Sequence, residues 1–176
     1  MDQLTPILGL PEGDFFLSDW SPEWSRLFEE EKRRITDALG NMILDVQHVG
    51  STSVPGLSAK PILDIAIGLA NLSDAERCKG PLETLGYEHA HWAGIDDQYV
   101  FAKGVERTHL IHAVEFKGPL WANYLRFRDA LRRSAKLRSE YEILKADLSQ
   151  QFADRRAAYT ERKGDFIRRV LAETIV

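Results

Sequence analysis

The segment QHVGSTSVPGLSAKPILDIAIGL, at residues 47–69, holds the residues of this chain whose types and spacing best suit chemistry. Gly50 and Ser51 open a turn rich in small residues, and Asp64 follows Ser51 by thirteen residues, within an apolar run. Burying a lone carboxylate in apolar surroundings is costly, so Asp64 needs a cation, a hydrogen-bond donor or a cleft. We therefore expect Asp64 to face a cleft. The alternative is an internal salt bridge or a hydrogen bond to loop N–H groups.

The turn before this carboxylate offers groups that hold anions. Ser51, Thr52 and Ser53 supply hydroxyl and backbone N–H groups of the kind that bind phosphates. Gly50 allows the backbone to approach a ligand closely. An ordinary turn rich in Ser and Thr is the alternative interpretation. On a strand, Asp64 shares its face with apolar neighbours, so its partner has to come from another segment.

The histidines form a second group of candidates. His109 and His112 are three residues apart in an expected strand, so they face opposite sides if that strand is regular. This geometry argues against a simple pair of metal ligands. His89 and His91 are expected at the surface or on an edge strand. His48, just before the turn, is either a site residue or a partner of the turn.

Hydrophobic periodicity and breaker residues indicate the elements that position these side chains. Residues 1–20 are expected to be irregular, and a helix begins after Ser21, has Pro22 in its first turn and closes at Gly40. We expect strands over 41–50 and 61–69, a helix from 73 that breaks at Gly80–Pro81, a hairpin with strands 98–103 and 108–116, and amphipathic helices over 119–134, 135–152 and 154–176. The pattern predicts an α+β fold with a small mixed sheet of four or five strands, an N-terminal helix and a C-terminal helical half at 119–173. A length of 176 residues favours one domain over 1–176.

Composition excludes several classes of protein. No apolar run approaches the ~18 residues of a membrane span, and no secretory signal is visible, so we expect a cytoplasmic protein without a membrane partner. The single Cys78 excludes an internal disulfide. The net charge of -4 gives no overall drive toward nucleic acid. Residues 121–176 are nonetheless basic, whereas residues 1–120 are acidic. The basic part either gathers phosphates where the two parts meet or consists of solvated helix faces. The sequence has no heptad pattern, so it does not indicate the oligomeric state.

The order of these motifs resembles a known family. A short strand, a Gly-Ser turn and an Asp on the next strand are similar to the signature of the nucleotidyltransferase superfamily. Longer strings resemble the GrpB family of bacterial proteins over about residues 20 to 172. These strings are HVGSTSVPGLSAKPILDI, RTHLIHAVE, FRDALR, EYEILKADL and YTERKGDFI. That family is placed in the nucleotidyltransferase fold, and membership alone does not define an activity.

The resemblance implies a role for each matching residue. Gly50 and Ser51 would form the phosphate turn, extended by Thr52 and Ser53, and Asp64 would be a catalytic carboxylate that holds Mg²⁺. Further residues would line the same cleft. These are Lys60 and Arg107 as phosphate or substrate contacts, His109 and His112 from the hairpin, Glu115 as a further acid, and Tyr159 and Lys163 from the last helix.

Two departures from the family pattern keep the function open. The superfamily usually has a second carboxylate two residues after the first, where this chain has Ala66, and Leu110 stands where many members have a histidine. One hypothesis is an enzyme that binds a nucleoside triphosphate with Mg²⁺ and transfers a nucleotidyl group to a small acceptor. Another is a catalytically degenerate nucleotide- or anion-binding module, and a third is a protein-interaction module that uses the C-terminal helices.

Overall fold

A five-stranded mixed sheet, in the order β1-β2-β5-β4-β3, forms the centre of the protein. The structure is a computed structural model that describes residues 7–11, 16–91, 96–151 and 156–174, without the side chains of 149–161. The strands are β1 (Asp45–Val49), β2 (Leu63–Leu69), β3 (Tyr87–His89), β4 (Tyr99–Lys103) and β5 (His109–Glu115). β2 and β5 are parallel, and the other neighbouring pairs are antiparallel. The α+β fold predicted from the sequence is confirmed.

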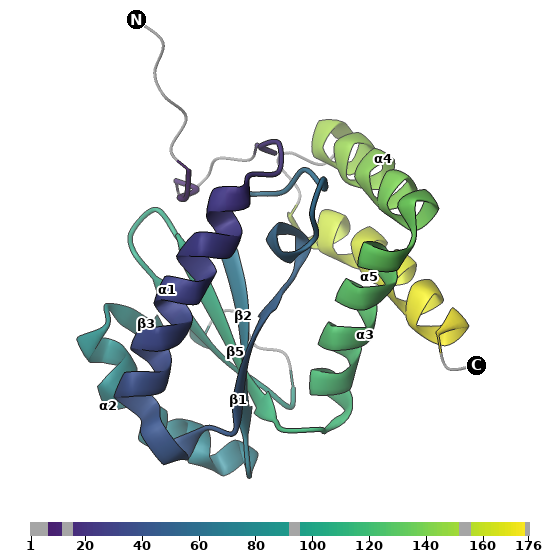
Figure 1. The fold of residues 1–176 in the computed structure, drawn as a ribbon. Helices are drawn as coiled ribbons and strands as arrows, with labels where there is room; N and C mark the ends of the chain where they lie inside the picture. Colours follow the sequence, from purple (N-terminus) through teal and green to yellow (C-terminus); the bar gives the residue numbers. More distant parts are fainter. Residues whose placement is uncertain (1–6, 12–15, 92–95, 152–155, 175–176) are drawn as a thin grey trace, which may run out of the picture.

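Helices cover both faces of the sheet (Figure 1). They are α1 (Pro22–Leu39), α2 (Ala75–Thr84), α3 (Pro119–Arg133), α4 (Ala135–Gln151) and α5 (Arg156–Glu173). α1 and α2 lie on one side, and α3, α4 and α5 lie on the other. Within the described part of the chain, every helix is too short or too polar to cross a membrane.

The alternation of β2 decides which side chains meet which layer. Ile65 and Ile67 are fully buried in the cluster that includes Trp24 of α1. Ala66 points the other way and packs with Trp121 of α3. Every residue of β2 except Asp64 is buried, as expected for a strand that is apolar on both faces. Asp64 therefore lies on the face that α3 covers.

The start and end of α1 follow the capping signals in the sequence. The Ser21 hydroxyl accepts a hydrogen bond from the Glu23 N–H at 3.2 Å, and Pro22 occupies the first helical position. Gly40 ends the helix with a φ of 52° and donates its N–H to Thr36. A short 3-10 helix at Gly40–Met42 follows, so β1 begins at Asp45, later than the strand expected over 41–50.

The region after β2 differs from the sequence prediction. α2 continues through Pro81, where the sequence indicated a break at Gly80–Pro81. Cys78 and Leu82 lie one turn apart on either side of this proline, and both are fully buried. Their packing holds the helix through a position that lacks an N–H donor. Two more 3-10 helices, Ser51–Ser53 (η2) and Leu72–Asp74 (η3), complete the connections.

Candidate functional site

The turn after β1 lies directly against Asp64. Val49 pairs with Asp64 in the antiparallel register of β1 and β2, so Gly50 comes next to the carboxylate. Gly50 has φ 68° and ψ -173°, a conformation almost restricted to glycine. A Cβ atom at this position would lie 2.8 Å from the Cβ of Asp64 and still closer to its Oδ2. Glycine is required here because the turn and the carboxylate approach so closely.

Most polar groups of the turn are used within it. Ser53 donates its hydroxyl to the Gly50 carbonyl at 2.6 Å, and the Thr52 hydroxyl contacts Nε2 of His48 at 3.0 Å. Thr52 and Ser53 are both buried, whereas Gly50 and Ser51 are half-buried. The sequence prediction that all four bind phosphate stays a prediction. The structure leaves Gly50 and Ser51 as the accessible part of the turn.

Asp64 is paired with a histidine of the neighbouring parallel strand. Its Oδ1 lies 3.0 Å from Nε2 of His112, and its side chain remains 31% exposed. His112 is the register partner of Ala66, so the imidazole stands beside the position where the superfamily has a second carboxylate. The carboxylate is therefore reachable from solvent and has an imidazole nitrogen as its partner.

A hydrogen-bonded chain continues from this histidine along the same face of the sheet, through α3 to the start of β4. Nδ1 of His112 lies 3.3 Å from the Tyr124 hydroxyl of α3, which donates to Oε1 of Gln98 at 2.8 Å. Nε2 of Gln98 is buried and has no hydrogen-bond partner among the residues that the structure describes. Tyr124 and Gln98 thus orient the ring of His112 toward Asp64. Sequence reasoning missed both residues, because nothing in their local spacing indicates the contact.

The C-terminal helices reach the turn through Tyr141 of α4. Burial raises the pKa of Tyr141 strongly, a hydrogen bond with Ser51 opposes this shift, and the charge of Asp64 adds to it. The ring stacks on Phe166 of α5 at 5.0 Å between centroids. Helical spacing alone indicated a core residue at position 141. The structure shows a core residue that also contacts the candidate site.

Two lysines bring positive charge to the same region. Lys145 of α4 is buried and donates to the Ser58 carbonyl, while Glu142 accepts from the Ser58 hydroxyl at 2.6 Å. Burial, and then the charge of Lys163 on α5, lowers the pKa of Lys145 to about 7. Lys163 is therefore close to Lys145, and its predicted contact with a nucleotide stays a prediction. The side chain of Tyr159, also predicted here, lies outside the described residues.

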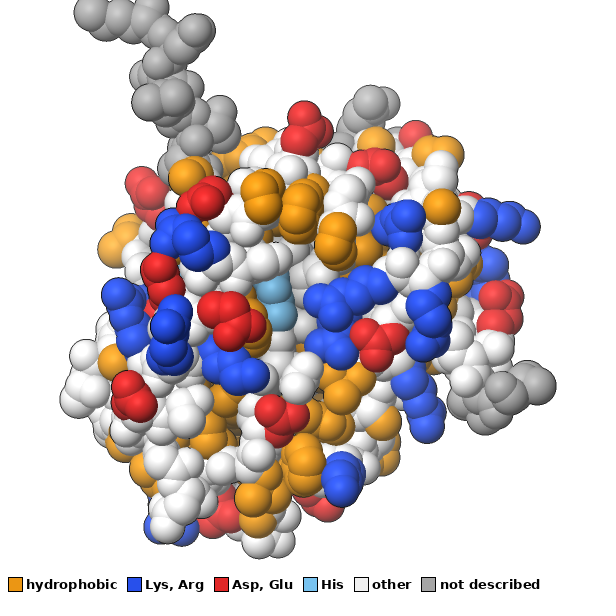
Figure 2. All heavy atoms as spheres, in the orientation of Figure 1, with side chains coloured by type: hydrophobic (Ala, Val, Ile, Leu, Met, Phe, Trp, Pro, Cys, Tyr) orange, Lys and Arg blue, Asp and Glu red, His pale blue; other side chains and the backbone are white. Residues whose placement is uncertain are grey.

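Arginines of α3 hold the backbone on both sides of Gly50. Arg128 donates to the His48 carbonyl at 3.0 Å, and Arg132 donates twice to the Ser53 carbonyl, at 3.0 and 2.8 Å. His48 is buried. It is a partner of the turn through Thr52 and stacks on Phe28 at 4.7 Å. Lys and Arg side chains are prominent on the α3 side of this face (Figure 2).

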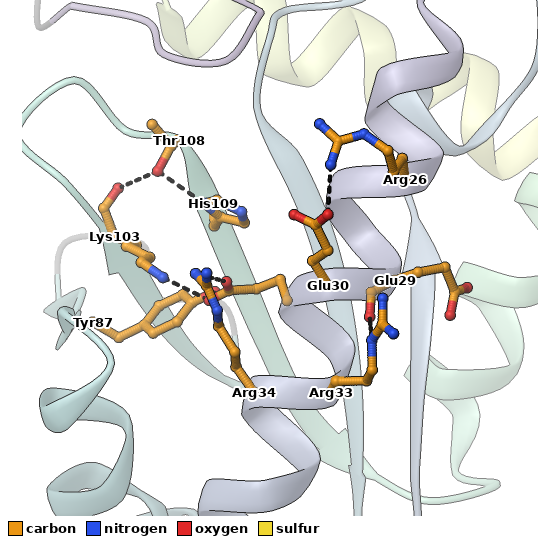
Figure 3. Close-up of polar contacts among 10 residues, drawn as sticks. Arg26, Glu29, Glu30, Arg33, Arg34, Tyr87, Lys103, Thr108 and His109 are labelled. Atoms are coloured by element: carbon orange, nitrogen blue, oxygen red, sulfur yellow. Dashed lines mark hydrogen bonds and ion pairs between the residues drawn. The ribbon is translucent and has the colours of Figure 1, made fainter.

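The structure does not bring His109 together with Asp64. His109 points to the opposite face of β5, where its ring is edge-on to Tyr87 and Nδ1 contacts the Thr108 hydroxyl at 2.8 Å (Figure 3). Burial lowers the pKa of His109 to about 4. The spacing of three residues predicted opposite faces for His109 and His112, and a regular strand produces them.

Glu115 also lies away from the candidate site. It is exposed at the C-terminal end of β5 and pairs with Leu69, whereas Asp64 is near the N-terminal end of β2. Lys60 precedes β2 and Arg107 closes the hairpin before β5, so both belong to the end of the sheet where Asp64 lies. Of the two additional catalytic candidates, His112 alone contacts Asp64 in the described structure.

The donor set does not suit a metal held by protein side chains alone. Among the described residues, no three His, Cys, Asp or Glu side chains converge as metal ligands. Ala66 is fully buried and offers no oxygen, and one oxygen of Asp64 already meets His112. A two-metal site needs carboxylates that bridge the ions. A Mg²⁺ ion bound mainly by ligand phosphates needs just one or two protein carboxylates, and Asp64 can supply one.

The fold and the position of this carboxylate define a class of protein. The chain has a nucleotidyltransferase-like fold, with the turn after β1 and Asp64 on the next strand. It matches the crystal structure of the Cid1 poly(U) polymerase with a TM-score of 0.50 and 10% identity, over 76% of this chain and 43% of that one. At this identity, the likeness concerns the fold alone.

Within that class, the chain belongs to the GrpB family. Residues 15–173 match the family described as GrpB protein. The chain is 35% identical over 173 residues to the "Glutamate-rich protein GrpB" of Alkalihalophilus pseudofirmus, which covers 95% of this chain and 99% of that protein. The conserved protein GrpB from Enterococcus faecalis has a similar structure, with a TM-score of 0.81 and 31% identity, over 90% of this chain and 96% of that one. The resemblance predicted from the motifs is confirmed.

Proposed function

We propose that this protein binds a nucleoside triphosphate through its phosphates at the Gly50–Ser51 turn, and that it acts as a nucleotide-binding module. One observation carries the proposal. The turn packs on Asp64, and Asp64 is paired with His112 beside Ala66, where a two-metal enzyme would have its second carboxylate. The turn supplies an accessible glycine backbone, and Lys163, together with the protonated fraction of Lys145, adds positive charge on the side of α4 and α5.

The pairing of Asp64 explains how an anion can approach a carboxylate. An unpaired carboxylate beside the turn would repel phosphate, because like charges a few ångströms apart disfavour each other. His112 is a hydrogen-bond donor to Asp64 in this arrangement and reduces the negative potential that a phosphate meets. Binding therefore needs no metal, although a Mg²⁺ ion carried by the nucleotide could still use Asp64.

The second candidate function is Mg²⁺-dependent nucleotidyl transfer to a small acceptor. The 31% exposure of Asp64 favours it, because a carboxylate open to solvent can meet a nucleotide-bound Mg²⁺ ion. In such a transfer an acceptor oxygen bonds to the α-phosphorus, the bond from this phosphorus to the pyrophosphate oxygen breaks, and the acceptor loses its proton. The Mg²⁺ ion would neutralise charge on the phosphates.

Calorimetry with ATP, CTP, GTP and UTP, each with and without Mg²⁺, tests both candidates. The binding module retains affinity without Mg²⁺ and releases no pyrophosphate. The transferase gains most of its affinity from Mg²⁺ and releases pyrophosphate when an acceptor is present. A folded sample that binds none of the four nucleotides contradicts both proposals.

Asp64→Asn separates the two candidates because the expected effects have opposite signs. In the binding module, removing the charge leaves metal-free binding intact or makes it tighter. In the transferase, the same change removes the Mg²⁺-dependent part of the affinity. Glu115→Gln is the matched control, since it neutralises an exposed carboxylate at the other end of the sheet.

A further inference from the structure

A groove runs along the free edge of β1, between α1 and α3, on the outer side of the turn. Its volume is about 260 Å³, and its lining includes Phe28, Lys32, His48, Arg128 and Arg132. β1 is the first strand of the sheet, and no other strand of the described ranges pairs with its outer edge. Figure 2 shows the same face, where a histidine side chain is visible between the two helices, with Lys and Arg side chains on the α3 side.

Two walls of the groove carry positive charge. Arg128 and Arg132 are one turn apart on α3, and Lys32 faces them from α1. Both guanidinium groups are held in place by the backbone carbonyls of β1 and of the turn, so their geometry is fixed before any ligand arrives. Fixed guanidinium groups favour oxyanions, because less side-chain freedom is lost on binding.

The charges in this groove are incompletely balanced. Asp129 lies 2.8 Å from Nε of Arg128 and 4.0 Å from Nη1 of Arg132, and Glu29 lies on the α1 wall. On the two walls, three cations against these two carboxylates leave one net positive charge, while the charge of Asp64 acts on His48 from the other face of the sheet. Burial lowers the pKa of Arg132, and the charge of Arg128 lowers it further, as expected for neighbouring cations. An anion between them would relieve this repulsion.

The floor of the groove is flat and weakly polar. Phe28 and His48 stack with an interplanar angle of 13°, and Nζ of Lys32 lies 5.9 Å from the Phe28 ring centroid. Burial lowers the pKa of His48 to about 4, so its ring is neutral at physiological pH. Charge–charge interactions are stronger beside such a floor than in open water.

We propose that this groove is a second anion site, which binds a small oxyanion, a phosphate or carboxylate group, between Lys32 on one wall and Arg128 and Arg132 on the other. Arg132 also holds the Ser53 carbonyl at the end of the turn. A bound oxyanion would therefore share a guanidinium group with the turn and change the turn's own affinity for a ligand. This coupling rests on the proposed function, whereas binding in the groove does not.

Titration of the full chain with inorganic phosphate, and separately with malonate, followed by ¹H–¹⁵N NMR, tests the proposal. The backbone amides of Val46, Gln47 and His48 should shift with one saturating curve. If only phosphate shifts these amides, the groove is a phosphate site. If phosphate and malonate both shift them, it is a general oxyanion site. No saturable shift with either ligand overturns the proposal.

Charge variants test the residues of the two walls. Lys32→Gln and Arg132→Gln should each weaken binding about tenfold, equivalent to one charge-assisted hydrogen bond. Glu29→Gln should tighten anion binding. Arg133 is exposed on α3 next to Arg132, and Arg133→Gln should leave anion binding unchanged. Among the described residues, neither Lys32 nor Glu29 forms a hydrogen bond or ion pair with the turn, so these two variants remain decisive if Arg132→Gln fails to fold. Unchanged affinity in both contradicts the site.

A parallel nucleotide titration keeps this proposal separate from the proposed function. If Lys32→Gln weakens phosphate binding measured at the β1 amides but leaves nucleotide affinity unchanged, the groove and the turn are distinct sites. If nucleotide never binds but the β1 amides still respond to phosphate, the proposed function fails and the groove remains. If phosphate shifts residues of the turn alone, the groove proposal is contradicted.

Discussion

At the scale of single residues, Gly50 carries the strongest structural demand. Its backbone conformation is almost restricted to glycine, and an added Cβ would lie 2.8 Å from the Cβ of Asp64. We predict that Gly50→Ala lowers the free energy of unfolding by about 3 kcal/mol, from backbone strain and steric overlap. Urea denaturation measures this loss. Gly56→Ala is the control, because Gly56 has φ 79° with open space around it and should lose about 1 kcal/mol. Equal losses would contradict the close approach.

The same scale shows which contacts a sequence can reveal. Gly50, Ser51 and Asp64 belong to one motif on adjacent strands, so their proximity could be predicted. His112 lies 48 residues from Asp64, and its contact depends on the parallel register of β2 and β5. Tyr124 enters from a third element. Side-chain chemistry in the sequence does not specify such registers, so the pairing of Asp64 required the structure.

At the scale of elements, one buried carboxylate fastens α1 to the sheet. Glu31 is 2% exposed, accepts from Lys103 at 2.7 Å and from the Tyr87 hydroxyl at 2.9 Å, and lies 3.4 Å from Arg34. Figure 3 shows Lys103, Tyr87 and Arg34 gathered at this helix. We predict that Glu31→Gln lowers the free energy of unfolding by about 3 kcal/mol, because Lys103 loses its ionic partner in a largely buried setting. Chemical denaturation measures the change.

The neighbouring Glu30 provides the control for this element. Glu30 pairs with Arg26 at the surface, and both side chains are well exposed, so Glu30→Gln should leave stability almost unchanged. Similar losses in the two variants would show that helix propensity, and not the buried network, holds α1. Hydrogen exchange in α1 gives a second measurement, since protection should fall in Glu31→Gln along this helix.

Elements differ in how well the sequence predicts them. α1, α3, α4 and α5 have long amphipathic patterns or capping residues, and their existence was predictable. The start of α2 was also predictable, but its continuation past Pro81 was not, because proline has a poor helix propensity that the packing of Cys78 and Leu82 overrides. β3 has three residues and no periodicity of its own, so its pairing with β4 becomes visible only in the folded sheet.

At the scale of the whole molecule, the helical half is part of the candidate site. Tyr141 and Phe166 pack with Val54 and Leu57, which follow the turn. The sequence predicted three helices and a mixed sheet, and the family resemblance predicted the fold that joins them. It did not predict that α4 would contact Ser51, because amphipathic patterns specify a buried face without specifying its partner.

The layer between the sheet and α1 buries two neutral histidines, His48 and His109, and this makes stability depend on pH. Burial lowers the pKa of both His48 and His109 to about 4, compared with 6.5 when exposed. Between these values the unfolded chain binds protons that the native protein does not. Stability therefore rises with pH and falls on acidification.

We predict that the free energy of unfolding decreases as the pH falls from 6.5 toward 4, by about 1.4 kcal/mol per pH unit for each of the two histidines. Urea denaturation at pH 7, 6 and 5 measures this slope. The pKa of Glu31 is lowered, so protonation of Glu31 affects stability only at more acidic pH than these. His48→Gln and His109→Gln should each remove about half of the slope, and the exposed His91→Gln should leave it unchanged. A stability that stays constant from pH 7 to 5 would show that protons reach both rings in the native state, and the layer between the sheet and α1 would then be open to water.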